Sequence, residues 1–209
     1  MSKVFPEIDF SNQAFPFMTF QFHEFQNTQL RIMRASFTGE MGYEVYVPSN
    51  SALKIWEQIQ EAGKEFGLTP YGTETMHLLR AEKGYIIVGQ DTDGSITPID
   101  LGLNWMIGKT KTDFLGKRSL TRSDTVRPDR KQFVGILPLN KEDSLEEGQH
   151  IFLNDSIQTP VPMLGHITSS YHSSIMGHTF GLAVLKDGRN FIGTKAFAST
   201  SNKKTIPVE

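Results

Sequence analysis

Apolar and polar positions change their period several times along this chain. Between residues 29 and 48, apolar and β-branched side chains flank a turn at 38–42, whose glycines permit positive φ angles. This pattern predicts a β-hairpin. Because strand side chains alternate between faces, Tyr43, Val45 and Val47 share one face of its second strand and leave Glu44 and Tyr46 on the opposite face.

A period near 3.6 follows in two segments and predicts two amphipathic helices. The first runs from about 51 to 66, with Ser49 or Asn50 as its N-cap, and the second runs from 73 to about 83 and ends at Gly84. The apolar positions expected to face inward are Leu53, Trp56, Ile59 and Phe66 in the first helix, and Met76, Leu78 and Leu79 in the second.

The rest of the chain predicts a second unit of different character. Residues 85–88 read as a short buried strand, and 89–98 as a polar loop. Charged residues with little to bury predict a linker at 123–131, between an α+β body at 1–122 and a unit at 132–209. Short apolar runs separated by turn residues predict a small antiparallel β-barrel for that unit. These runs are 133–139, 165–169, 180–185 and 191–197.

The N-terminal segment, residues 1–28, is rich in phenylalanine but has no regular period, and Pro6 and Pro16 interrupt any helix. We expect such an aromatic segment to pack against another surface. That surface could belong to polypeptide upstream of this chain. The start has neither a basic leader nor an apolar signal core, and no apolar run reaches bilayer length. A cytoplasmic location without membrane contact is therefore the expectation.

Composition removes several functional classes. The formal net charge is −2 at pH 7, which disfavours nucleic acid as a partner. The chain has no cysteine, and this excludes disulfides, thiolate zinc sites, iron–sulfur clusters and a catalytic thiol. No flavin or NAD site is expected either.

Several residue groups suggest chemistry, but each has a simpler structural interpretation. The turn at 39–42 lacks the third glycine of a phosphate-binding loop and leads into a strand. The histidines lack metal-ligand spacing, so no metal is predicted. Ser169 near His172 lacks a nucleophile elbow, and the loop from Asp91 lacks the glutamate of a calcium site. Glu44 taken alone is typical of a solvent-facing strand residue.

Longer motifs carry a family resemblance. The segment 34–48 (RASFTGEMGYEVYVP) resembles the strand–turn–strand of the glycine-cleavage aminomethyltransferase (T-protein) family. Residues 79–84 (LRAEKG) with the GQD and TP that follow, and 165–169 (GHITS), resemble its next helix and loop and its barrel strand. The segment 71–91 (YGTETMHLLRAEKGYIIVGQD) is most similar to the alpha subunits of heterotetrameric sarcosine oxidases.

This resemblance implies a truncated folate-binding fold with a small C-terminal barrel. It also implies that the chain helps to transfer the carbon of oxidised sarcosine to tetrahydrofolate, giving 5,10-methylenetetrahydrofolate. Glu44 falls on the family's pterin-binding glutamate and Phe37 on its tyrosine, while Met76 replaces an arginine near the folate tail. Tyr43 is the remaining candidate for cofactor binding.

The resemblance places the family's reactive aspartate upstream of Met1, and Asp9 does not occupy its motif. No catalytic residue is therefore predicted here, and the isolated chain is expected to bind folate better than it catalyses. The expected partners are the other sarcosine oxidase subunits or the missing upstream half-domain. Alternatives are a non-catalytic fragment that docks on partner subunits, or a fragment of a glycine-cleavage aminomethyltransferase. An iron–sulfur-maintenance relative would need a cysteine where Tyr85 stands.

Overall fold

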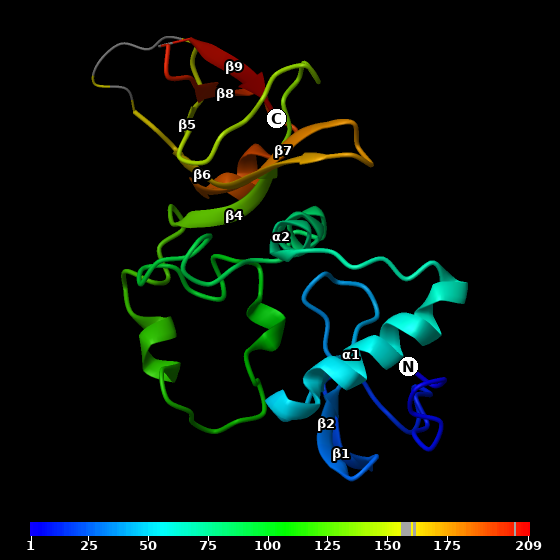
Figure 1. Cartoon of the computed structure of the whole chain (residues 1–209). Helices are drawn as coiled ribbons and strands as arrows, with labels where there is room; N and C mark the ends of the chain where they lie inside the picture. The colour runs from blue at the N-terminus through cyan, green and yellow to red at the C-terminus, as the bar shows by residue number, and fades with distance from the viewer. Residues whose placement is uncertain (156–159, 161, 203) are drawn as a thin grey trace. The chain divides into compact units, whose positions relative to one another are not determined.

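A computed structural model describes residues 1–155, 160, 162–202 and 204–209 of the chain (Figure 1). The contacts divide it into two compact units, residues 1–83 and 84–209, called here the first and second units. Each unit has its own cluster of buried apolar side chains. The linker predicted at 123–131 stays a prediction, because these contacts group it with the second unit without testing it as a boundary.

A three-stranded antiparallel sheet forms the centre of the first unit. It consists of β1 (Phe20–Phe25), β2 (Thr28–Met33) and β3 (Glu44–Tyr46), in that order. The predicted hairpin is confirmed by the pairing of β2 with β3. Strand β1 was not foreseen in the phenylalanine-rich segment. It joins β2 through Gln26 and Asn27, whose φ angles of 50° and 61° suit a tight hairpin turn.

The aromatic N-terminal segment packs within its own unit. Its buried side chains form one apolar cluster with Leu30 and Ile32 of β2 and with Ile55 of the helix that follows the sheet. Arg34 holds the segment in place, since its Nη1 donates to the carbonyl of Phe15 at 2.7 Å. The buried side chains of this cluster are Val4, Phe5, Ile8, Phe15, Leu30, Ile32 and Ile55.

The first predicted helix is confirmed as α1 (Ser49–Gly63), which continues into a 3-10 turn, η1 (Lys64–Phe66). The prediction of its N-cap was wrong. Pro48 occupies the N-cap position, where its fixed φ suits the entry to a helix. No side chain caps the helix. Gly67 ends the turn in the left-handed conformation.

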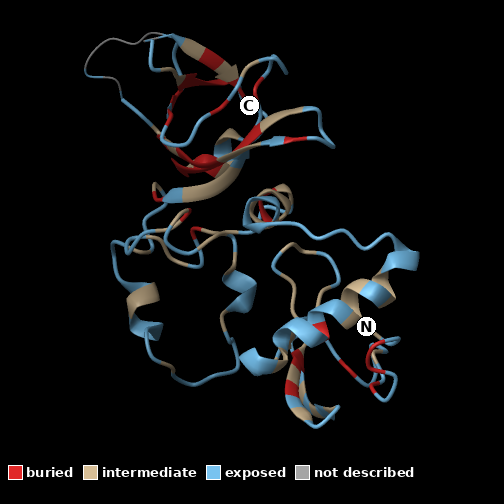
Figure 2. Ribbon diagram, in the orientation of Figure 1, coloured by how far each residue is buried: buried red, intermediate tan, exposed pale blue. Residues whose placement is uncertain are grey.

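The inward face of α1 also differs from the prediction. Ile55 is buried and Ile59 and Ala62 pack on the same cluster, an i, i+4, i+7 stripe. Leu53, Trp56 and Phe66 were expected to face inward but are 69%, 52% and 71% exposed. Most of α1 is accordingly pale blue in Figure 2.

The second predicted helix is confirmed as α2 (Thr73–Glu82), and Gly84 beyond it has a positive φ of 70°. Its burial was predicted only in part. The expected inward residues Met76, Leu78 and Leu79 are half-buried, while Arg80 and Ala81 are fully buried. An arginine at a buried helix position could not be foreseen from apolar spacing.

Residues 85–88 are neither a strand nor buried, so that prediction was wrong. Tyr85 is 49% exposed and Val88 is 83% exposed. Side chains of the turn that follows bind the backbone of this region: Asp91 Oδ2 accepts a hydrogen bond from the amide of Ile87 at 2.8 Å, and Thr92 Oγ1 accepts one from the amide of Gly89 at 3.2 Å.

The predicted C-terminal antiparallel barrel is confirmed. Its described strands follow the order β4-β7-β6-β5-β8-β9, and every neighbour is antiparallel. The first and last strands meet, since the amides and carbonyls of Leu137 and Glu209 exchange hydrogen bonds of 2.9 and 3.0 Å. The strands are β4 (Lys131–Ile136), β5 (His150–Phe152), β6 (Gly165–Ser173), β7 (His178–Lys186), β8 (Ala196–Ser199) and β9 (Thr205–Val208).

Burial in the barrel follows strand position. Strand β7, which lies between β4 and β6, is mostly buried and contains the predicted apolar run (Figure 2). The run predicted at 191–197 is only partly strand, because a 3-10 turn, η4 (Gly188–Phe191), precedes β8. Gly165 is required where β6 meets β7, since a Cβ there would lie 1.9 Å from the carbonyl oxygen of Val184.

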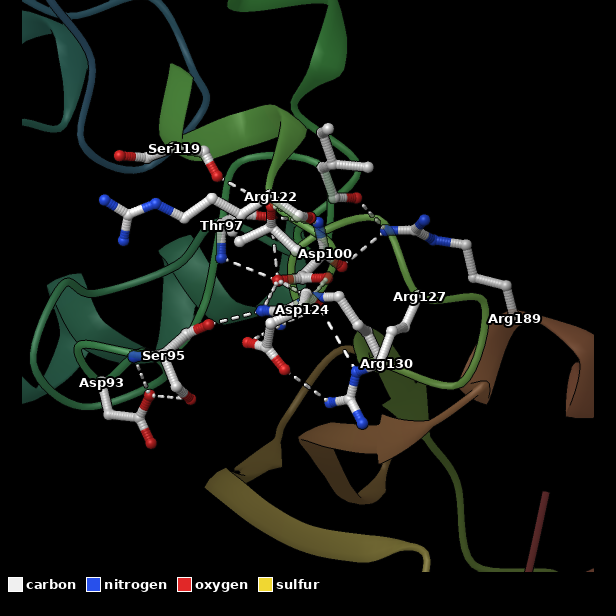
Figure 3. Close-up of polar contacts among 12 residues, drawn as sticks. Asp93, Ser95, Thr97, Asp100, Ser119, Arg122, Asp124, Arg127, Arg130 and Arg189 are labelled. Atoms are coloured by element: carbon white, nitrogen blue, oxygen red, sulfur yellow. Dashed lines mark hydrogen bonds and ion pairs between the residues drawn. The ribbon is translucent and has the colours of Figure 1, made fainter. Parts of the chain in front are cut away.

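A buried ion pair ties the loops of the second unit to the start of the barrel (Figure 3). Arg130 donates from Nε to Asp100 Oδ1 at 2.9 Å and from Nη2 to Oδ2 at 2.6 Å. Thr97 adds its amide and its hydroxyl to Oδ2 at 2.7 and 2.8 Å. The short turns η2 (Asn104–Met106) and η3 (Lys117–Thr121) lie between these partners in the sequence.

Candidate functional site

The three-stranded sheet of the first unit has one buried face and one accessible face, because its strands alternate strictly. Along β1, exposed and half-buried residues alternate three times. In β3, Glu44 and Tyr46 are exposed and Val45 between them is half-buried. The strand register places the outward side chains in adjacent rows. We call this the outer face; its residues are Phe20, Phe22, Glu24, Gln29, Arg31, Met33, Glu44 and Tyr46.

Glu44 lies on the outer face with its side chain exposed. The hydroxyl of Tyr46, two residues along the same strand, donates a hydrogen bond to Glu44 Oε2. This hydrogen bond raises the pKa of Tyr46, because it stabilises the protonated phenol. The predicted pterin-binding carboxylate is therefore accessible and already has one fixed neighbour.

Arg31 packs against the same tyrosine from the neighbouring strand. The register pairs Arg31 with Tyr46, and the guanidinium carbon lies 4.2 Å from the centroid of the Tyr46 ring. The same carbon is 5.8 Å from the ring of Phe20. A cation over an aromatic face is attracted by the ring quadrupole, which holds both side chains in place.

Tyr43 lies on the opposite face from Glu44. Its ring packs edge-on against Phe10 at 5.1 Å and lies 6.0 Å from the ring of Phe15. Its hydroxyl reaches the carbonyl of Phe10 at 3.5 Å. The structure thus brings Tyr43 into the aromatic core and not beside Glu44, and its contact with a cofactor stays a prediction.

Phe37 lies near helix α2, and Met76 is part of that helix. Phe37 follows β2, is 43% exposed, and its ring lies 6.4 Å from that of His77 on α2. Met76 is the preceding helical residue and is half-buried. An accessible phenylalanine beside a histidine offers a flat surface for a ligand ring, while Met76 offers no charge.

The turn between β2 and β3 is shaped by its glycines and one ion pair. Gly39 has a φ of 80°, and a Cβ there would lie 2.6 Å from Lys83 Cγ. Gly42 is needed for a different reason, since a Cβ would lie 2.8 Å from the carbonyl oxygen of Ala35. Glu40 pairs with Lys83 Nζ at 2.6 Å, which fastens the turn to the end of α2.

Sequence reasoning missed Arg31 and His77 as parts of the site. It placed Tyr46 on the same face as Glu44, because i and i+2 residues of a strand share a face, but did not name it as a candidate site residue. Arg31 could not be found, since its place opposite Tyr46 depends on the register between two strands joined by a long loop. His77 lies near Phe37 only through the tertiary fold.

Asp91, for which the sequence favoured a structural turn over a calcium site, is almost fully buried in the second unit. Asp91 is 1% exposed and accepts hydrogen bonds from Thr168 and Ser169, both at 2.6 Å. Gln90 Nε2 donates to Ser169 Oγ at 3.1 Å, where a hydrolase would need a histidine. Within residues 1–155, 160, 162–202 and 204–209, no group of three or more possible metal ligands is found.

Two family models match this chain in succession. The GCVT N-terminal domain matches residues 1–111, and the glycine cleavage T-protein C-terminal barrel domain matches residues 131–209. The chain belongs to the glycine cleavage T-protein family. The three-stranded sheet unit and the curled antiparallel barrel are therefore parts of an aminomethyltransferase-like fold, as the motifs predicted.

Curated relatives of this family member include two sarcosine oxidase alpha subunits. The protein from Corynebacterium sp. (strain P-1), named sarcosine oxidase subunit alpha, is 50% identical over 92% of this chain and 20% of its own length. The protein of the same name from Rhizobium meliloti (strain 1021) is 39% identical over 87% of this chain and 18% of its own. The chain thus spans about a fifth of these relatives.

A solved structure shows the same fold. The glycine cleavage system aminomethyltransferase T from Bartonella henselae superposes with a TM-score of 0.75 at 24% identity. The match covers 95% of this chain and 52% of that one. As for membranes, the described part of this family member contains no helix with the length and apolarity needed to cross a bilayer.

Proposed function

We propose that this chain is the folate-binding part of a sarcosine-oxidising enzyme of the T-protein family. In this role it binds tetrahydrofolate, which takes the carbon of oxidised sarcosine as 5,10-methylenetetrahydrofolate. The identity to two sarcosine oxidase alpha subunits supports the choice of reaction. The observation that carries the proposal is the exposed carboxylate of Glu44 on the outer face, at the family's glutamate position.

The residues of the first unit fit the proposed ligand at its pterin edge. A carboxylate accepts two parallel N–H bonds, which matches the 2-amino and N3 groups of a pterin. Tyr46 occupies one position on Oε2, so Oε1 and a further lone pair of Oε2 remain for these donors. Met76 offers no charge to the folate tail, so the main polar anchor is Glu44.

We assign this chain a binding and orienting role and no catalytic residue. An iminium carbon is already electrophilic, and holding the folate nitrogen in place supplies most of what the transfer needs from a protein. Proposed partners are the other sarcosine oxidase subunits, or polypeptide that supplies the rest of the fold. Such partners are plausible because the relatives are about five times as long as the matched region.

The experiment is a fluorescence titration of the 209-residue chain with tetrahydrofolate. The wild type should show a saturable change. Glu44→Gln should weaken binding on the order of a hundredfold, because two charge-assisted hydrogen bonds are lost at about 1.5 kcal/mol or more each. The matched control is Glu24→Gln, an exposed glutamate on the outward side of β1. Equal affinity of Glu44→Gln and the wild type would contradict the proposal.

A second candidate function is docking without folate binding, and exposed apolar side chains favour it. Phe17, Phe20 and Phe22 are 62%, 54% and 63% exposed, and Trp105 and Leu115 of the second unit are also largely exposed. Exposed apolar side chains that lie together, as Phe20 and Phe22 do with ring centroids 5.6 Å apart, are typical of subunit contacts. This alternative predicts no saturable change with tetrahydrofolate in the same titration. A fragment of a glycine-cleavage aminomethyltransferase would bind tetrahydrofolate in the same way.

A further inference from the structure

Glu44 does not stand alone on the outer face. Tyr46 shares the face because it lies two residues further along β3, and its hydroxyl donates to Glu44 Oε2. The hydrogen bond joins two side chains of one strand, so its geometry is set by the strand itself. A glutamate side chain otherwise samples many rotamers at a surface, and freezing them on binding costs affinity.

Tyr46 is in turn held from the side. The Arg31 guanidinium carbon lies 4.2 Å from the Tyr46 ring centroid and 5.8 Å from that of Phe20. Phe20 packs edge-on against Phe22 with ring centroids 5.6 Å apart. A continuous row of contacts therefore runs across all three strands and ends at the carboxylate.

The row acts on only one of the two carboxylate oxygens. The phenol donates to Oε2, while no donor from the described residues contacts Oε1. A carboxylate with one oxygen fixed and the other open keeps its plane and still presents acceptor sites outward.

We propose that Tyr46 and Arg31 are positioning residues that hold the Glu44 carboxylate ready for a ligand with two adjacent N–H donors. The inference rests on the proposed function, because it names how that same carboxylate is prepared. Tyr46 acts directly through its hydroxyl, and Arg31 acts through the ring of Tyr46. Neither residue needs to contact the ligand for the effect.

The first test is tetrahydrofolate affinity of the 209-residue chain. Tyr46→Phe keeps the ring and its contact with Arg31 but removes the donor, and it should weaken binding about five- to tenfold. Arg31→Gln removes the cation over the ring and should weaken binding about two- to fivefold. The matched control is Tyr71→Phe, an exposed tyrosine of the same unit outside the outer face, which should bind as the wild type does.

The second test reads the contact without any ligand. Alkaline titration of phenol absorbance in the wild type minus Tyr46→Phe isolates the ionisation of Tyr46. The hydrogen bond to Glu44 raises the pKa of Tyr46, followed by desolvation and the Glu44 charge, while the Arg31 charge opposes them. Glu44→Gln should therefore lower the pKa of Tyr46. A merely structural role for the tyrosine would not produce this shift.

The outcomes separate the two proposals. Loss of binding in Glu44→Gln together with wild-type affinity in Tyr46→Phe overturns the positioning role and leaves the folate proposal standing. Wild-type affinity in Glu44→Gln overturns the folate proposal and the positioning role with it. An unchanged pKa of Tyr46 in Glu44→Gln overturns the positioning role whatever the affinities are. Weakened binding in Tyr46→Phe with a lowered Tyr46 pKa in Glu44→Gln supports it.

Discussion

Glu44 of the first unit and Asp100 of the second unit are carboxylates in opposite situations. Asp100 is 3% exposed and its oxygens accept donors from Arg130 and Thr97. Glu44 is exposed and receives one phenol hydroxyl on one oxygen. A carboxylate whose acceptor sites are filled by the fold holds loops together, whereas one with open sites is available to a ligand.

The comparison is sharpest where burial is greatest, so the largest expected effect is at Arg130. Arg130→Ala would leave the Asp100 carboxylate buried without its charge partner, and we expect a loss of about 3–5 kcal/mol in the free energy of unfolding. Urea denaturation followed by circular dichroism measures it. Lys186→Met is the control, because its pair with Asp129 at 3.2 Å is half exposed and screened by solvent, so its loss should leave the stability nearly unchanged. Similar losses for both variants would contradict the structural role of Asp100.

A second buried carboxylate tests whether the rule extends beyond one ion pair. Asp91→Ala removes the acceptor for the hydroxyls of Thr168 and Ser169 and for the amide of Ile87. We expect a loss of about 2–3 kcal/mol, because the buried donors lose a charged acceptor and some find another partner. The control is Asp93→Ala, whose exposed turn bond to the Ser95 amide should contribute about 1 kcal/mol. An equal loss in both variants would show that burial of the acceptor does not matter.

The sequence predicted the exposed position of Glu44 but not the ion pair of Asp100. The alternation along β3 was enough to place Glu44 outward, because strand period is a local property. The ion pair of Asp100 could not be predicted, since its partner lies thirty residues away in a segment that looked like a linker. The barrel runs were visible as apolar stretches, but their pairing order and the bulge between Ile167 and Ser169 depend on distant strands. Local patterns thus predicted the two helices and the outward face of β3, while tertiary contacts decided which helix residues are buried.

The stability that Asp100 contributes should depend on pH. Burial raises the pKa of Asp100, but the hydrogen bonds from Arg130 and Thr97, together with the Arg130 charge, outweigh it and hold the pKa below its ordinary value. The stabilisation is therefore present above the unfolded pKa of about 3.9 and is lost as the pH falls through the lower, folded pKa. Urea midpoints measured between about pH 6 and pH 3 should fall in the wild type, and should fall less steeply in Asp100→Asn. Parallel pH profiles would contradict this assignment.

The smallest expected change in stability is at Glu44, and it completes the comparison. Glu44→Gln keeps an acceptor for the Tyr46 hydroxyl and buries nothing new, so its free energy of unfolding should stay within about 0.5 kcal/mol of the wild type. The same variant should nevertheless lose most of its affinity for tetrahydrofolate. Urea denaturation and ligand titration on one preparation measure both quantities. A carboxylate whose acceptor sites are kept for a ligand contributes little to the free energy of unfolding until that ligand binds. A stability loss comparable to that of Asp91→Ala would therefore mean that Glu44 stabilises the fold.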